Sequence, residues 1–169
     1  TAQAANVLSH LEYYLQIVWP ELNVNVVSTT EQWAGAAIAG PKSRDMLSKL
    51  YPDLDVSNDA LPFMGYKEAE FFGVPSRIFR ISFSGELAYE INVKSDHGLF
   101  MWEKMMEVGK EFGNQPYGTE ALSTLRIEMG HVAGPELDGR TIPSDVSLNG
   151  LVSKKKDFIG KNSLGREAF

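Results

Sequence analysis

Apolar and polar residues alternate along residues 79–93, and this pattern predicts two neighbouring strands. The odd positions are apolar on both sides of Ser84-Gly85, whereas the even positions are mostly polar. An alternation with a period of two is typical of a sheet with one packed face. Ser84-Gly85 predicts a tight turn between the strands. The polar side of the second strand is then expected to carry the carboxylates of Glu86 and Glu90.

The remaining pattern predicts helices and further strands on both sides of this segment. Helical spacing of apolar residues covers residues 2–18, with Thr1 as a possible N-cap, then about 41–50, 95–112 and 119–129. Strand-like stretches occur around 24–26, 32–39 and 67–73, and residues 52–65 and 130–150 are expected to be irregular. We therefore predict an α+β fold with mixed or antiparallel sheets and packed helices.

Composition and charge exclude several classes of protein. The chain has 169 residues, no cysteine, 22 acidic and 16 basic residues, and a formal net charge of −6. The absence of cysteine excludes disulfides and thiol chemistry, and the acidic balance disfavours a nucleic-acid partner. No apolar stretch approaches the ~20 residues that span a bilayer, and no signal peptide is recognisable. We expect a cytoplasmic protein with no membrane partner.

Glu90 is the main candidate for chemistry, and two interpretations remain open. It is either an ordinary solvent-facing strand residue or a carboxylate that accepts two parallel N–H bonds from a planar amidine-like group. Phe83 and Tyr89 are expected to line a flat ligand or to belong to the core. We expect no metal site, because the three histidines lack ligand spacing.

Two charged segments have a simpler default explanation. Arg126 is expected to pair on the polar face of its helix. Lys154, Lys155 and Lys156 form a short basic run, which is usually a solvated surface. The run could also attract a polyanionic ligand tail such as polyglutamate.

Four segments in a fixed order resemble the aminomethyltransferase (glycine-cleavage T-protein) superfamily. These are Phe83-Ser84-Gly85-Glu86-Leu87-Ala88-Tyr89-Glu90-Ile91, Pro116-Tyr117-Gly118-Thr119-Glu120-Ala121-Leu122, Leu125-Arg126-Ile127-Glu128-Met129-Gly130 and Lys156-Asp157-Phe158-Ile159-Gly160-Lys161. Further segments, among them Trp19-Pro20 and Leu61-Pro62-Phe63-Met64, resemble the branch that contains the alpha subunits of heterotetrameric sarcosine oxidases. The similarity spans nearly the whole chain.

The resemblance implies folate chemistry. In this family a strand glutamate, here Glu90, holds the amino-pyrimidine edge of tetrahydrofolate, and the ring at Phe83 is often a tyrosine in relatives. Tyr89 is expected nearby as wall or support. The essential acid of the family falls outside this sequence, and a position that is Arg in T-protein is Leu122 here. We therefore expect no catalytic residue among residues 1–169 and a single partial folate-binding domain over 1–169, apparently a piece of a longer chain.

The same resemblance implies partners and alternatives. FAD, FMN and NAD are expected only in an intact complex with other oxidase subunits. A dimethylglycine dehydrogenase or T-protein relative would differ in the amine donor. A folate-sensing module without catalysis and a purely structural subunit-contact domain are further alternatives, since one fold can carry several functions.

Overall fold

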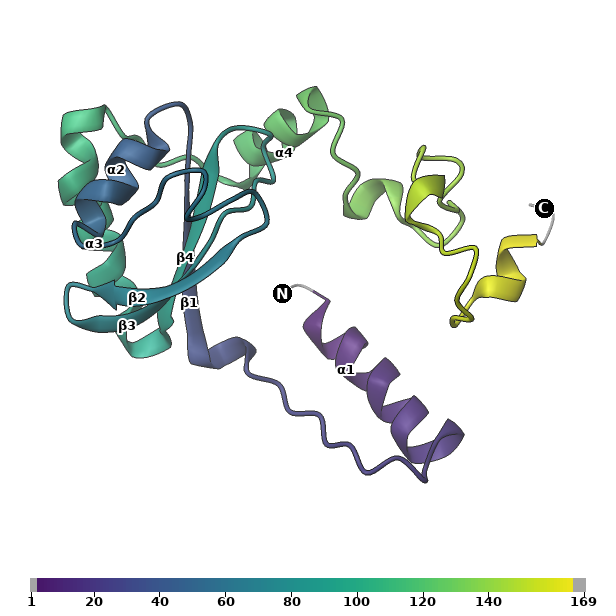
Figure 1. The fold of residues 1–169 in the computed structure, drawn as a ribbon. Helices are drawn as coiled ribbons and strands as arrows, with labels where there is room; N and C mark the ends of the chain where they lie inside the picture. The colour runs from purple at the N-terminus through teal and green to yellow at the C-terminus, as the bar shows by residue number, and fades with distance from the viewer. Residues whose placement is uncertain (1–2, 166–169) are drawn as a thin grey trace. The chain divides into compact units, whose positions relative to one another are not determined.

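A computed structural model describes residues 3–165, which divide into two compact units (Figure 1). The first unit contains the described residues up to Ser82 together with Glu86–Pro116, and the second contains Phe83–Gly85 and the described residues from Tyr117 onward. These units are groups of residues in mutual contact, and the expectation of a single domain over residues 1–169 stays a prediction.

The first unit contains an antiparallel sheet of four strands. The strands are β1 (Trp33–Ala39), β2 (Tyr66–Phe71), β3 (Val74–Phe79) and β4 (Ala88–Lys94). Their order is β1-β4-β3-β2, so β4 is a central strand between β1 and β3. Together with the helices, this sheet confirms the predicted α+β class.

The register of β3 and β4 corrects the predicted distribution of faces. Phe79 pairs with Glu90 and Ile78 pairs with Ile91, so odd residues of β3 share a face with even residues of β4. The prediction that the odd positions of both strands form one packed face is therefore wrong. The packed face consists of Ile78 from β3 and the odd residues of β4, and the other face carries Phe79 beside Glu90.

The connection between β3 and β4 is also longer than predicted. The strands end at Phe79 and begin at Ala88, so the expected two-residue turn at Ser84-Gly85 is wrong. Gly85 has a φ of +84°, and a Cβ at this position would lie 2.5 Å from the Met129 side chain. Within this connection, Phe83–Gly85 belongs to the second unit.

The four predicted helices are present with shifted ends. They are α1 (Ala4–Tyr13), α2 (Ser43–Leu50), α3 (Gly98–Gly109) and α4 (Thr119–Glu128). A π-helical turn, Tyr14–Val18, extends α1 toward its predicted end. The predicted N-cap Thr1 lies outside the described residues. No strand forms at 24–26, where the backbone has no ladder partner among the residues described.

Short helical turns mark the ends of several elements. The 3-10 turns are Thr30–Gln32, Ser95–His97, Lys110–Phe112, Gly134–Glu136, Asn149–Leu151 and Lys161–Gly165. The last three give the second unit most of its regular structure after α4, in line with the irregular segment predicted after residue 130.

The core of the first unit lies between one face of the sheet and helices α2 and α3 (Figure 1). Its fully buried members include Leu47, Phe71, Ile78, Tyr89, Ile91, Val93 and Met101. Helix α3 approaches β1 closely, because a Cβ at Gly98 would lie 2.8 Å from the Cβ of Ala34. Since both helices cover this face, the face that carries Glu90 points away from them.

Candidate functional site

The candidate site is the sheet face opposite α2 and α3, which we call the Glu90 face. Its members follow from the strand register: Trp33, Gly35 and Ala37 of β1, Tyr66 and Glu68 of β2, Arg77 and Phe79 of β3, and Glu90, Asn92 and Lys94 of β4. Because strand side chains alternate between faces, these residues project to one side of the sheet. The face thus combines aromatic rings, small residues and charged groups.

Glu90 lies in the middle of this face with a small neighbour on one side and a large one on the other. Its direct partners are Ala37 on β1 and Phe79 on β3. Glu90 and Phe79 are half-buried, whereas Ala37 is exposed. Within residues 3–165, no side chain or backbone group hydrogen-bonds or ion-pairs with the Glu90 carboxylate. The carboxylate is therefore available as an acceptor for a ligand.

Two aromatic rings extend the face from Glu90 toward the sheet edge. The ring centroids of Tyr66 and Phe79 are 5.0 Å apart at an angle of 39°. The Tyr66 hydroxyl donates a hydrogen bond to Glu68, and this bond raises the pKa of Tyr66 above its ordinary value. The rings therefore offer an aromatic surface beside the carboxylate.

Asn92 follows Glu90 by two residues and lies against Gly35. A Cβ at Gly35 would lie 2.6 Å from Oδ1 of Asn92. The absence of a side chain at Gly35 is what lets the Asn92 amide lie low over β1. The face is consequently shallow on the β1 side of Glu90.

Tyr89 is a core residue on the opposite side of β4 from Glu90. Its side chain is fully buried, and its hydroxyl accepts a hydrogen bond of 3.0 Å from Nε of Arg44. Tyr89 therefore anchors β4, the strand that carries Glu90, on the core side of the sheet. This placement favours the role of support over that of a wall.

Phe83 belongs to the second unit, whereas Glu90 and Tyr89 belong to the first. Its ring is 40% exposed, and its centroid lies 4.7 Å from that of the His131 imidazole. Glu86, expected on the strand beside Glu90, lies before β4 and is exposed. Of the two carboxylates expected there, only Glu90 belongs to the strand.

The second unit is organised around a buried arginine. Nη1 of Arg126 lies 2.5 Å from Oε2 of Glu136 and 3.2 Å from the carbonyl of His131. Glu136 also accepts a 2.9 Å bond from the amide of Ala133. The hydrogen bond from Arg126 lowers the pKa of Glu136. Arg126 is thus paired, as expected, but inside the unit rather than on a solvated face.

The basic run of the second unit is exposed. Lys154, Lys155 and Lys156 all face solvent, and the backbone amides of Lys155 and Lys156 donate to Oγ of Ser153. The serine thereby forms the turn that presents the three side chains.

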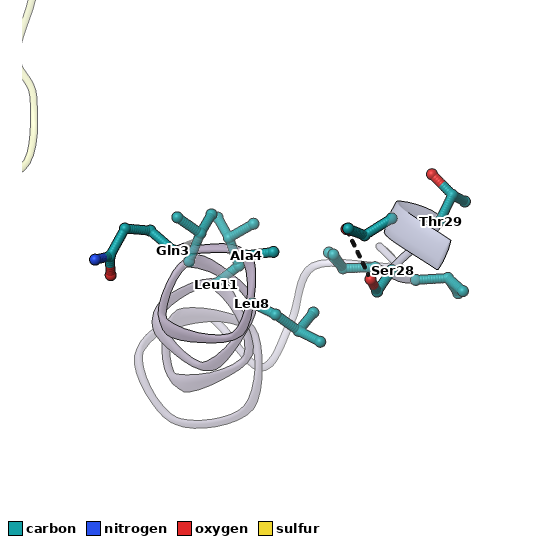
Figure 2. Close-up of a pocket in the computed structure, with 10 residues that line it drawn as sticks. Gln3, Ala4, Leu8, Leu11, Ser28 and Thr29 are labelled. Carbon is teal, nitrogen blue, oxygen red and sulfur yellow. Dashed lines mark hydrogen bonds between the residues drawn. The ribbon is translucent and has the colours of Figure 1, made fainter. Parts of the chain in front are cut away.

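A separate hollow lies along α1 in the first unit. It measures about 360 Å³ and lies between α1 and residues 26–30. Figure 2 shows Leu8 and Leu11 on the helix side, with Ser28 and Thr29 on the other side. None of the described residues that line this hollow has a titratable side chain, so they offer apolar contact rather than acid–base chemistry.

Residues 3–165 contain neither a metal-binding cluster nor a membrane-spanning helix. No group of three or more His, Asp or Glu side chains in that range could hold a metal ion. None of the described helices has the length and apolar character needed to cross a bilayer.

Sequence reasoning did not find Phe79 and Tyr66 as neighbours of Glu90. The predicted turn already implied the strand register that makes them neighbours. A two-residue turn at Ser84-Gly85 pairs Phe83 with Glu86, which already places odd residues of one strand beside even residues of the next. The observed pairing of Phe79 with Glu90 follows the same register.

Comparison with known proteins gives relatives for nearly the whole chain. It is 50% identical over 169 residues to the sarcosine oxidase subunit alpha of Corynebacterium sp. (strain P-1), an alignment that covers 99% of this chain and 18% of that protein. It is 34% identical to the mitochondrial dimethylglycine dehydrogenase of Mus musculus, covering 84% of this chain and 17% of the relative. It is also 34% identical to the aminomethyltransferase of Chloroherpeton thalassium, covering 85% and 40%.

These relatives confirm the resemblance predicted from the ordered motifs. The chain spans about a fifth of the length of the sarcosine oxidase relative. Residues 1–156 match the family described as the GCVT N-terminal domain. The chain therefore belongs to the GCVT N-terminal domain family.

Proposed function

We propose that this chain is the tetrahydrofolate-binding region of a sarcosine oxidase alpha subunit. In that role it captures the methylene group from the oxidative demethylation of sarcosine, giving 5,10-methylenetetrahydrofolate and glycine. The 50% identity to a sarcosine oxidase subunit alpha over nearly the whole chain supports this assignment. FAD, FMN, NAD and the other subunits belong to the assembled enzyme, which we place in the cytoplasm.

The observation that carries the proposal is the carboxylate of Glu90, which has no hydrogen-bond or ion-pair partner within residues 3–165 and lies on a face with aromatic neighbours. The amino-pyrimidine edge of a reduced pterin presents two parallel N–H donors. A carboxylate accepts both in a fork of charge-assisted hydrogen bonds. Phe79 flanks this carboxylate in the ladder, and Tyr89 supports β4 from the core side. Phe83 is the third residue that we propose as a folate contact.

The proposed step transfers one carbon from the oxidised amine to tetrahydrofolate. The carbon of the iminium formed from sarcosine gains bonds to N5 and N10 of tetrahydrofolate and loses its bond to nitrogen. The two hydrogens released from N5 and N10 end on that nitrogen, which leaves as glycine, so no electron acceptor is consumed. We assign no catalytic residue within this chain. Glu90 binds and orients the pterin so that N5 and N10 meet the carbon.

Glu90→Gln in the assembled oxidase tests the assignment. We expect tetrahydrofolate-dependent formation of 5,10-methylenetetrahydrofolate to fall at least tenfold, since one charge-assisted fork is lost. Sarcosine-dependent oxygen uptake should continue, with free formaldehyde replacing the folate product. Glu70→Gln is the matched control, because Glu70 is an exposed glutamate of edge strand β2 that lies on the same face of the sheet as Glu90. Normal folate coupling in Glu90→Gln would refute the role.

The isolated 169-residue chain provides a second test. We expect it to bind tetrahydrofolate weakly or not at all and to show no turnover. Calorimetric titration of tetrahydrofolate into the chain measures this directly. Tight stoichiometric binding would contradict the expectation of a partial site.

The donor amine distinguishes the related alternative. Relatives named dimethylglycine dehydrogenase and aminomethyltransferase are less similar than the sarcosine oxidase relative, so we favour sarcosine. Oxidation of dimethylglycine in preference to sarcosine would identify the first alternative. Folate binding without any amine oxidation would identify a folate-sensing module, and an assembled protein that binds no folate would identify a structural subunit-contact domain.

A further inference from the structure

An arginine and a tryptophan stack at the end of the Glu90 face where β4 finishes. Cζ of Arg77 lies 3.9 Å from the centroid of the Trp33 ring, a cation–π distance. Nε of Arg77 also lies 3.7 Å from Oε1 of Glu68, and 43% of the Arg77 side chain remains exposed. Because the ring and Glu68 both restrain the guanidinium, its exposed N–H groups have a limited range of directions.

Lys94 adds a second positive charge at the same end of the face. It pairs with Trp33 across the β1–β4 ladder, and it is exposed. In the part of the chain that the structure describes, no carboxylate forms an ion pair with Lys94. Arg77 of β3 and Lys94 of β4 thus bring two positive charges to the Trp33 end of the face.

The spacing between this cationic end and Glu90 suggests a ligand. Lys94 follows Glu90 by four residues on β4, which corresponds to about 13 Å at the usual rise of a strand. In tetrahydrofolate, an aminobenzoyl group and an amide separate the pterin from the glutamyl carboxylates. That separation is comparable with three to four extended residues, or roughly 10–13 Å.

We propose that Arg77 and Lys94 bind the glutamyl carboxylates of tetrahydrofolate while Glu90 holds its pterin. This inference rests on the proposed function. The guanidinium supplies directed N–H donors, and the lysine supplies a mobile point charge. The folate then lies along β4, with its negative end over the two cations and its N–H donors at the carboxylate.

Glycine and sarcosine also carry a carboxylate that Arg77 and Lys94 could bind. Glycine and sarcosine are much shorter than the distance from Glu90 to Lys94, so they cannot join the two ends of the face. The exposed run from Lys154 to Lys156 belongs to the second unit and forms no part of this tail site.

The test compares two ligands in the assembled oxidase. Tetrahydrofolate carries the tail, and 6-methyltetrahydropterin has the same ring system without any carboxylate. We expect Lys94→Gln and Arg77→Gln each to weaken the binding of tetrahydrofolate about twofold to fivefold, as for a partly exposed ionic contact. Binding of 6-methyltetrahydropterin should be unchanged in both variants. Lys110→Gln, which removes an exposed lysine from the Lys110–Phe112 turn, should change neither.

The outcomes separate this inference from the proposed function. If Glu90→Gln weakens both ligands while Lys94→Gln and Arg77→Gln change neither, the tail site is refuted and the pterin site stands. If the unmodified oxidase binds neither ligand, the proposed function itself fails. If Lys94→Gln weakens the binding of sarcosine rather than that of tetrahydrofolate, Lys94 binds the carboxylate of the amino acid and the tail assignment is wrong. Lys94 is exposed, so its variant should fold even where Arg77→Gln does not.

Discussion

Phe79 and Glu90 are direct cross-strand neighbours on the outer face of the sheet. Their pairing places an apolar ring beside a carboxylate that has no partner among the residues the structure describes. This arrangement suits a flat heterocycle, because the ring excludes water from one side of the carboxylate while the other side stays accessible.

Replacing Phe79 by Leu should weaken pterin binding and leave the fold intact. Stacking of an aromatic side chain on a heterocyclic base contributes roughly 1–3 kcal/mol, so we expect about a tenfold rise in the Kd for tetrahydrofolate. Leucine keeps most of the apolar volume. Phe63→Leu is a suitable control, since Phe63 is an exposed loop residue. An unchanged Kd in Phe79→Leu would exclude a stacking role.

The buried hydroxyl of Tyr51 should make the first unit sensitive to alkaline pH. Tyr51 is 2% exposed, and burial raises its pKa to about 12. Ser76 donates its own proton to the carbonyl of Ala69, so Tyr51 is the donor in the 2.9 Å bond to Ser76. The folded state disfavours the ionised phenolate because burial keeps water away from it, and the bond to Ser76 offsets only part of this effect.

The sign of the effect follows from the raised pKa. The unfolded chain ionises near pH 10 and the folded chain near pH 12, so stability is full below pH 10 and falls between these values. The loss approaches about 2–3 kcal/mol. Chemical denaturation between pH 9 and 12 measures it, and Tyr51→Phe should flatten this part of the profile. A profile that is identical in both proteins would contradict the assignment to Tyr51.

The contact between Gly98 and Ala34 should be a site of overpacking. A Cβ at Gly98 would lie 2.8 Å from the Cβ of Ala34, and neither the helix nor the strand has a flexible group to move there. We expect Gly98→Ala to destabilise the protein by about 1–2 kcal/mol, despite the better helix propensity of alanine.

A double-mutant cycle checks this contact. Ala34→Gly removes the opposing methyl group, so the combined variant should recover most of the packing loss after the cost of Ala34→Gly alone is subtracted. Urea denaturation of the four proteins gives the coupling free energy. Additive effects would show that the two positions do not interact.

Loss of the bond between Arg126 and Glu136 should loosen the second unit. Glu136→Gln removes the charge from a bond to a buried guanidinium, so we expect faster hydrogen exchange at the amides of Ala133 and His131. Glu128→Gln, at an exposed position at the end of α4, is the matched control. Equal exchange rates in both variants would argue against an organising role for this pair.

The same pair should also confer acid sensitivity. Arg126 holds the pKa of Glu136 below its usual value near 4.5. A lowered carboxylate pKa adds stability above the unfolded value, and this stability is lost as the pH falls below it. Exchange protection at Ala133 should therefore decrease below about pH 4.5 and be insensitive to acid in Glu136→Gln.

Helices and most strands of this chain could be predicted from the sequence because they depend on local periodicity. The apolar stripe of α2, with Met46, Leu47 and Leu50, and the pattern of Trp33–Ala39 each determine one element. Val24 and Val26 alternate in the same way but have no strand beside them in the described residues. Pairing, which a local pattern does not encode, decides whether such a segment becomes a strand.

The candidate site was only partly accessible to sequence reasoning. Glu90 could be identified from its place in a strand and from the family resemblance. Arg77 and Trp33 are 44 positions apart in the chain, and only the order β1-β4-β3 brings their side chains together. Such long-range neighbours follow from sheet topology, so no pattern within a single strand predicts them.

The irregular stretch between β3 and β4 has an evolutionary consequence. A one-residue insertion within a paired strand would rotate every following side chain to the other surface and bury Glu90. The strands end at Phe79 and begin at Ala88, so extra residues beside the exposed Glu86 would lengthen a linker without changing that orientation. Related sequences can therefore differ in the length of the β3–β4 connection while Glu90 keeps its place on the same face of the sheet.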